Sequence, residues 1–256
     1  MKVAFQESGK GRPLVLLHAF PLSRKMWKPQ IDALVETGCR VILPDLRGFG
    51  ETPKIAGKTT MEDLANDVKE LLDLLEIEKA IIGGLSMGGY VTLNLYRLYP
   101  DKFATMFLAD TSSFADTEEK RKGRFSLIEK ILSFGMEAAV EEMLPNLISD
   151  HTKTHNQKLV KQLEKEFLQT NPEGAIAALR GMAERLEHTY MLQDISVPTL
   201  LIFGKEDKVT DLEGAKVLNE RIPNSKLEII QNIGHYSNLE DPEHFNRILV
   251  DFVRGH

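Results

Sequence analysis

Short runs of apolar residues alternate along the chain with longer segments in which apolar residues recur every three or four positions. A short run is typical of a strand buried on both faces of a parallel sheet, and the recurring pattern is typical of an amphipathic helix. Strands are predicted at 3–7, 14–17, 40–44, 81–85, 103–109, 198–204 and 226–230. Helices are predicted between them at 27–37, 61–75, 89–99, 211–221 and 242–254. This regular order favours a mostly parallel sheet with helices on both faces.

The middle of the chain interrupts this alternation. Between 111 and 192 no segment has the pattern of a strand, and helices are predicted at 118–134, 136–144, 155–168 and 172–186. We therefore expect an α/β fold whose doubly wound core is formed by residues 1–111 and 191–256. Residues 112–190 are expected to form an inserted helical cap.

One serine lies where the strand 81–85 gives way to a helix. Ser86 stands in the sequence Gly84-Leu85-Ser86-Met87-Gly88, which has the G-x-S-x-G spacing of a nucleophile elbow. A strand that turns at once into a helix passes close to its neighbours, and glycine has no Cβ to collide there. The turn raises the serine hydroxyl above the sheet, next to backbone N–H groups that stabilise a developing negative charge.

Further candidate side chains follow later strands. Asp207 comes shortly after the strand 198–204, and His235 follows the strand 226–230. The order Ser, Asp, His suits a serine nucleophile, because an imidazole can accept the hydroxyl proton and a buried carboxylate can orient the imidazole. Asp110, which ends the strand 103–109, is a second candidate for the acid.

Composition narrows the functional classes. The 256 residues have a formal net charge of -6 and a pI near 5.7, so no positive excess is available for nucleic acid. No apolar run approaches the ~20 residues that span a bilayer, and the opening residues lack the apolar region of a signal peptide. With Cys39 as its single cysteine, the protein is expected in the cytoplasm, away from membranes. Metal-ligand spacing is absent, so we expect no metal and no cofactor.

Together the motifs resemble the α/β-hydrolase superfamily over essentially the whole chain. They are, in order, HAFP at 18–21, DLRGFG at 45–50, GLSMGG at 84–89, GKED at 204–207 and GH at 234–235. The resemblance implies Ser86 as nucleophile, Asp207 as acid and His235 as base. It also implies that the backbone N–H groups of Phe20 and Met87 hold the oxyanion.

The loop after the strand 14–17 departs from the family at one position. Ala19 stands where glycine is usual, and its methyl group could shift the Phe20 amide. We interpret His18 as a brace for this loop through a backbone hydrogen bond. Asp45 and Arg47, in the loop after the next strand, are interpreted as a structural network.

A serine at the elbow indicates an acyl-enzyme. Family members that open epoxides or remove halides carry aspartate there, because their intermediate is an alkyl ester. The resemblance implies that Ser86 attacks an ester or lactone carbonyl, that His235 protonates the leaving alcohol, and that water releases the acid. Two alternatives share the fold: a receptor that binds its ligand with little turnover, and a cofactor-free perhydrolase side activity.

The substrate is expected to bind beneath the cap. Its pocket is predicted to include Trp27, Phe114, Phe134, Met143 and Tyr236. Such apolar walls favour a small or medium uncharged acyl group. Cap arginines that could instead meet a carboxylate are Arg121, Arg124, Arg180 and Arg185. The elbow and the segments 178–183 and 234–240 are similar to those of 3-oxoadipate enol-lactonases and neighbouring esterases.

Overall fold

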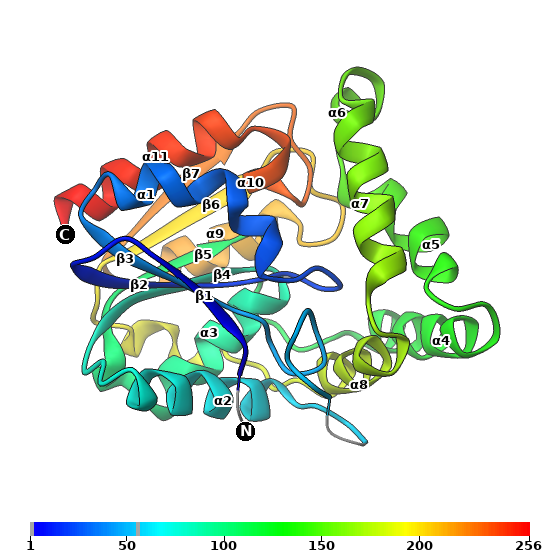
Figure 1. Ribbon diagram of the computed structural model, residues 1–256, viewed down its shortest axis with the longest axis horizontal. Coiled ribbons are helices and arrows are strands. Elements are labelled where there is room, and N and C mark those ends of the chain that lie inside the picture. The colour runs from blue at the N-terminus through cyan, green and yellow to red at the C-terminus, as the bar shows by residue number, and fades with distance from the viewer. Residues whose placement is uncertain (1–2, 55–56) are drawn as a thin grey trace.

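A computed structural model describes residues 3–54 and 57–256, and its centre is a seven-stranded sheet in the order β1-β3-β2-β4-β5-β6-β7 (Figure 1). The strands are β1 (Phe5–Ser8), β2 (Arg12–Leu17), β3 (Cys39–Pro44), β4 (Ala80–Leu85), β5 (Phe103–Ala109), β6 (Thr199–Gly204) and β7 (Ser225–Ile230). β1 pairs antiparallel with β3, and every other neighbouring pair is parallel. The predicted α/β fold class is confirmed. The carboxyl ends of six strands therefore meet at one edge of the sheet.

Helices cover both faces of this sheet (Figure 1). One face carries η1 (Arg24–Gln30), α1 (Ile31–Val35), α10 (Ser237–Glu240) and α11 (Pro242–Gly255). The other carries α2 (Met61–Leu74) and α3 (Met87–Leu98), while η2 (Pro100–Lys102) precedes β5 and α9 (Leu212–Arg221) contacts β6 and β7. The single helix predicted over 27–37 is wrong: the segment starts as a 3-10 turn that contains Pro29. Proline has no N–H, so it weakens an α-helical hydrogen-bond ladder.

The start of α2 shows how local sequence sets an element boundary. The Asp63 N–H donates to the Thr60 hydroxyl at 3.0 Å, and the Thr60 N–H donates to the Asp63 carboxylate at 2.8 Å. This capping box satisfies two backbone donors that the helix leaves free. The helix therefore begins where the sequence predicted.

Between β5 and β6 the chain forms a helical layer beside the sheet (Figure 1). Its helices are α4 (Glu118–Phe134), α5 (Glu137–Leu147), α6 (Asp150–His155), α7 (Gln157–Gln169) and α8 (Pro172–Ala183), followed by η3 (Thr189–Asp194). We call residues 118–183 the α4–α8 segment. The helix predicted over 155–168 corresponds to α7. Two predictions are corrected, because α5 continues through Pro145 and a separate short helix, α6, precedes α7.

The helix α8 lies directly against the backbone of two core loops. A Cβ on Gly174 would stand 2.0 Å from the Gly48 carbonyl oxygen, and one on Gly181 would stand 1.7 Å from the Thr59 carbonyl oxygen. The Thr59 N–H also donates to the Ala177 carbonyl at 3.2 Å. Only glycine fits at such short distances. The two glycines on α8 therefore allow the helix backbone to lie in direct contact with the core backbone.

Candidate active site

Ser86 occupies the turn between β4 and α3. Its φ of 55° lies in the left-handed region, which residues with a Cβ adopt at a cost in energy. A Cβ on Gly84 would lie 2.4 Å from the Gly88 carbonyl carbon, and one on Gly88 would lie 2.2 Å from the Leu17 carbonyl oxygen. The two glycines thus let β4, α3 and β2 pass close together, as the motif predicted. The turn leaves 8% of Ser86 exposed.

His235 and Asp207 form a buried pair. The His235 Nδ1 and the Asp207 Oδ2 are 2.8 Å apart, and the two side chains are 2% and 0% exposed. The carboxylate is held by its own loop, since the N–H groups of Val209 and Thr210 donate to Oδ1 at 2.8 and 3.1 Å. An ionised carboxylate accepts only, so Nδ1 carries the proton and Nε2 is left as a proton acceptor.

The pair shifts both ionisation equilibria. Burial alone would lower the pKa of His235, but the Asp207 charge and the hydrogen bond outweigh it and raise that pKa above its usual 6.5. Burial alone would raise the pKa of Asp207, but the histidine and the loop donors hold that pKa below its usual value. The imidazolium is therefore stabilised when it forms, as proton abstraction by a histidine requires.

Asp110, the other candidate acid, forms its hydrogen bonds with groups other than His235. Its Oδ1 accepts from the Gly204 N–H at 2.8 Å, and its Oδ2 accepts from the Ser237 hydroxyl. The side chain is fully buried, and this burial, together with the nearby Asp207 charge, raises its pKa well above the usual value. His235 Nδ1 thus donates its hydrogen bond to Asp207 and not to Asp110.

The loop after β2 is braced by His18. Its Nδ1 lies 3.0 Å from the Ala19 carbonyl oxygen, and its Nε2 accepts from the Leu46 N–H at 2.9 Å. The second bond makes Nε2 the acceptor, so the ring is neutral with its proton on Nδ1. Burial lowers the pKa of His18, which agrees with a neutral ring. The predicted bracing role is confirmed, and the Ala19 methyl group is accommodated in the core.

The predicted network in the loop after β3 is also present. Arg47 donates through Nε and Nη2 to both oxygens of Asp67 at 2.7 Å. Asp45 forms an ion pair with Arg24 and accepts from the Glu51 N–H at 2.8 Å. Each of the two charges thus has its own partner, Asp67 for Arg47 and Arg24 for Asp45. This supports the structural interpretation of Asp45 and Arg47.

A cleft of about 350 Å³ lies between the α4–α8 segment and the core. Its wall residue Tyr90 donates its N–H to the Ser86 carbonyl at 3.1 Å. A second wall residue, Leu147, accepts from the His235 N–H at 3.0 Å, and a third, Val209, donates to the carboxylate beside the histidine. Ser86 and His235 are not themselves part of the cleft wall, so the wall is linked to them through these backbone hydrogen bonds.

Of the side chains predicted to line the pocket, Met143 lines this cleft and the other four do not. Trp27 is fully buried against two core phenylalanine rings, and Tyr236 is fully buried with its hydroxyl bonded to a backbone carbonyl. Phe134, at the end of α4, is 70% exposed, and Phe114 is half-buried. Apolar side chains near the site thus mostly pack the core or face solvent.

Polar residues of the cleft were largely missed from the sequence. Arg124 and Arg185 line it, but Arg121 and Arg180 do not, and Lys120 was not predicted. Tyr90 could have been found, because it lies one helical turn after Ser86 and so shares its face of α3. The lysine had no comparable signal, since charged residues recur throughout its helix.

In 3–54 and 57–256, no three or more His, Cys, Asp or Glu side chains gather closely enough to hold a metal ion. In the same ranges, no helix has the length and apolar character needed to cross a membrane.

A parallel sheet with a serine at a strained strand-to-helix turn, followed by an aspartate and histidine pair at later strand ends, defines an α/β hydrolase. The family model described as alpha/beta hydrolase fold matches residues 12–242, and the chain belongs to that family. It is a hydrolase in the branch that includes esterases and enol-lactonases.

Three similar proteins illustrate that branch. The 3-oxoadipate enol-lactonase 1 of Acinetobacter baylyi is 31% identical, with 94% of this chain and 88% of the relative covered. A thermophilic esterase from Thermogutta terrifontis, solved with malate bound, is 37% identical with a TM-score of 0.95, covering 99% and 93% of the two chains. The enol-lactonase from Burkholderia xenovorans LB400 is 25% identical with a TM-score of 0.91, covering 98% and 96%.

Proposed function

We propose that the protein hydrolyses carboxylic esters or lactones with small to medium acyl groups, using Ser86, His235 and Asp207 as a catalytic triad. The observation that carries this proposal is the buried 2.8 Å bond between His235 Nδ1 and Asp207, in a fold that places Ser86 on an elbow. Likeness to an enol-lactonase and an esterase supports the same class of substrate.

In the proposed reaction, Ser86 Oγ attacks the carbonyl carbon while its proton passes to His235 Nε2. The tetrahedral intermediate collapses, the bond to the leaving oxygen breaks, and that oxygen takes the proton from Nε2. Water then attacks the acyl carbon, giving its proton to Nε2, and the Ser86 oxygen leaves with that proton. Asp207 stabilises the imidazolium in both halves and keeps its own negative charge.

The negative oxygen of each intermediate would be bound by the backbone N–H groups of Phe20 and Met87. Met87 is the first residue of α3, where an N–H has no acceptor within the helix and the helix dipole favours negative charge. In this proposal residues 112–190, which contain the α4–α8 segment, act as a cap over the bound acyl group.

The test is hydrolysis of short-chain esters, long-chain esters and acidic lactones by the wild type and by Ser86→Ala. We expect release of acid from the short esters or the lactones by the wild type and loss of that turnover in the variant. Substantial turnover by Ser86→Ala would overturn the triad. Stoichiometric binding of the same compounds without product would instead indicate a receptor, and turnover only with added hydrogen peroxide would indicate a perhydrolase.

A further inference from the structure

The residue next to the proposed base is a buried tyrosine. Tyr236 directly follows His235, its side chain is fully buried, and its hydroxyl donates to the Phe20 carbonyl oxygen at 3.0 Å. Burial raises the pKa of Tyr236 well above its usual 10, so the hydroxyl keeps its proton and remains a donor. The loop that carries the histidine is thereby joined to the loop after β2, although 216 positions separate the two bonded residues.

The loop after β2 begins directly beside the turn that carries the serine. A Cβ on Gly88, in the first turn of α3, would lie 2.2 Å from the Leu17 carbonyl oxygen and 3.0 Å from the His18 carbonyl oxygen. The strands β2 and β4, which lead into the two loops, are neighbours in the sheet. The backbone that leads to Phe20 is therefore next to the turn at Ser86.

Both peptide groups that flank Phe20 are held by hydrogen bonds. The Ala19 carbonyl accepts from the Leu22 N–H at 3.0 Å and lies 3.0 Å from the His18 Nδ1, which carries the ring proton. Because a peptide group is planar, the direction of this carbonyl also fixes the direction of the Phe20 N–H. Tyr236 holds the next peptide group by its carbonyl. The orientation of the Phe20 N–H is thus set from both sides of the residue.

A second hydroxyl holds the next carbonyl of the same loop. Thr170, directly after α7, donates to the Pro21 carbonyl oxygen at 2.7 Å. Thr170 belongs to the α4–α8 segment, whereas Tyr236 belongs to the loop of the histidine. Two hydroxyls from different parts of the chain therefore hold neighbouring carbonyls of the loop 18–21.

We propose that Tyr236 and Thr170 are positioning residues for the oxyanion hole: their hydroxyls hold the loop 18–21 so that the Phe20 N–H points at the oxygen that becomes negative. They act through the backbone of Phe20 and not on the substrate. This inference rests on the proposed hydrolase function and adds to it the groups that set the geometry of one oxyanion donor. Phenylalanine at 236 would keep the packing of the ring and remove only the hydroxyl, so the two roles of Tyr236 can be separated.

The test compares Tyr236→Phe with the matched control Tyr96→Phe. Tyr96 is also buried, and its hydroxyl donates to the Asp194 carbonyl at 3.3 Å. It lies toward the other end of α3, about 15 Å from Ser86 along the helix axis. With 4-nitrophenyl butyrate, Tyr236→Phe should lower kcat about tenfold at an unchanged KM, because a displaced donor weakens binding of the transition state more than binding of the substrate. Tyr96→Phe should leave both values unchanged.

A trifluoromethyl ketone separates positioning from packing. Ser86 Oγ adds to the carbonyl carbon of 1,1,1-trifluoro-2-heptanone, its proton passes to His235 Nε2, and the carbonyl oxygen becomes a stable oxyanion. The inhibition constant of this ketone should rise about tenfold in Tyr236→Phe, in proportion to the loss of kcat, and stay unchanged in Tyr96→Phe. The acidic limb of the pH profile should stay at its wild-type position, because the bond between His235 and Asp207 is intact.

The outcomes separate this inference from the proposed function. Hydrolysis by the wild type together with unchanged kcat and ketone inhibition in Tyr236→Phe, or with a displaced acidic limb, would overturn the positioning role and leave the hydrolase standing. If Tyr236→Phe does not fold, Thr170→Val decides: equal losses of about fivefold in kcat and in ketone affinity, as one neutral hydrogen bond implies, support the role, and unchanged values refute it. No hydrolysis by the wild type would refute the proposed function, and this inference with it.

Discussion

Asp110 accepts a hydrogen bond from the Ser237 hydroxyl, although 127 positions separate the two residues. Its second oxygen accepts from the Gly204 N–H at 2.8 Å. Gly204 opens the loop that carries Asp207, and Ser237 follows His235 closely. The buried carboxyl group of Asp110 thus connects the loop that carries Asp207 to the loop that carries His235, and so helps to fix the relative position of these two side chains.

This arrangement predicts unequal effects of two similar substitutions. Asp207→Asn should lower kcat roughly 10⁴-fold, because an amide can favour the wrong imidazole tautomer and cannot stabilise the imidazolium. Asp110→Asn should retain most of kcat, because its amide can accept from Gly204 and donate to the Ser237 oxygen. Steady-state kinetics on one neutral ester measure both. An equally large loss in Asp110→Asn would mean that Asp110 takes part in proton transfer.

Asp110→Ala should act on stability instead. The variant leaves the Gly204 N–H and the Ser237 hydroxyl without their acceptor in the core, at a cost of about 1–3 kcal/mol for each buried group. Urea unfolding should show this loss in Asp110→Ala and little of it in Asp110→Asn. Equal stability of the two variants would contradict the linking role of the carboxylate.

The pH dependence of activity follows from the raised pKa of His235. Only the neutral imidazole accepts the serine proton, so kcat/KM should fall as the pH drops through a value above 6.5. Asp207→Asn removes the charge that raises this pKa, and its acidic limb should move to lower pH. An acidic limb at the same pH in the wild type and in Asp207→Asn would contradict the assignment of Asp207 as the partner of His235.

The raised pKa of His235 also affects folding. It contributes folding stability below pH 6.5, and this stability is lost as the pH rises through the pKa of the folded state.

His188 predicts a second pH effect, this time on stability. Neither ring nitrogen has a hydrogen-bond partner in the described residues, and burial, aided by the Arg97 charge, lowers the pKa of His188 to about 4. Because the unfolded chain binds the proton more readily, stability present above pH 6.5 is lost as the pH falls toward 4, by up to about 3 kcal/mol. Thermal unfolding at stepped pH should show a smaller slope for His188→Leu. The exposed control His155→Leu should keep the wild-type slope.

The contact between α8 and the core predicts opposite results for two Gly→Ala changes in helices. A Cβ at Gly174 would clash with the Gly48 carbonyl, so Gly174→Ala should lose about 1–3 kcal/mol and disturb the cleft, raising KM. Gly123, on α4, has nothing within 4 Å of such a Cβ. Gly123→Ala should gain up to about 1 kcal/mol from helix propensity. Unfolding curves for both variants give the comparison, and a neutral Gly174→Ala would show that α8 can shift freely.

Local patterns predicted what depends on local chemistry. The start of α2 at residue 61 and the apolar strand β5 both depend on residues that are neighbours in sequence, and both were predicted correctly. His18 was predicted to form a backbone hydrogen bond, and it forms one to the adjacent Ala19 and a second to Leu46, which is 28 positions away and was not predicted. Order along the chain also placed Ser86 at the turn into a helix.

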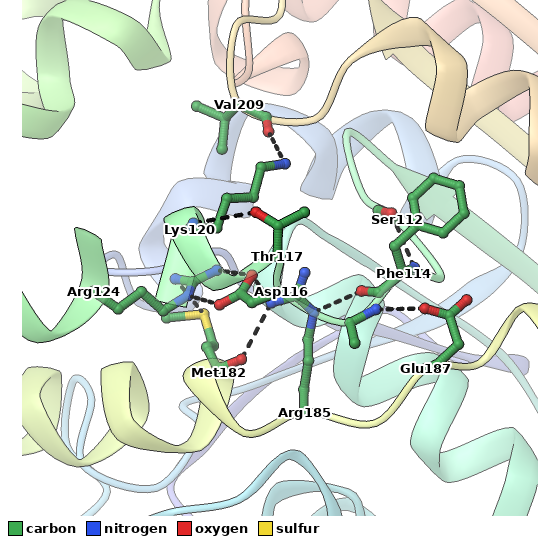
Figure 2. Close-up of polar contacts among 11 residues, drawn as sticks. Ser112, Phe114, Asp116, Thr117, Lys120, Arg124, Met182, Arg185, Glu187 and Val209 are labelled. Carbon is green, nitrogen blue, oxygen red and sulfur yellow. Dashed lines mark hydrogen bonds and ion pairs between the residues drawn. The ribbon is translucent and has the colours of Figure 1, made fainter. Parts of the chain in front are cut away.

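Side-chain surroundings that depend on distant segments were not predictable in this way. Trp27 was expected in the pocket but is buried against Phe107 and Phe245, which are far away in sequence. Asp116 joins Arg124 to Arg185 across 8 and 69 positions, and no spacing rule reports such a pair (Figure 2). The local sequence around an aromatic or charged residue is the same whether the side chain lines a pocket or packs in the core. Only the tertiary packing determines which of the two occurs.

The stack of Arg185 on Tyr90 also joins the nucleophile's helix to the segment that follows α8. Tyr90 lies one turn of α3 after Ser86, about 6 Å along the helix axis, and the Arg185 guanidinium lies 4.3 Å from the centre of its ring. Arg185 belongs to the chain after α8, whose glycines at 174 and 181 lie against the backbone of two core loops. A displacement of α8 would therefore move the guanidinium off the ring and alter the surroundings of the helix that begins next to Ser86.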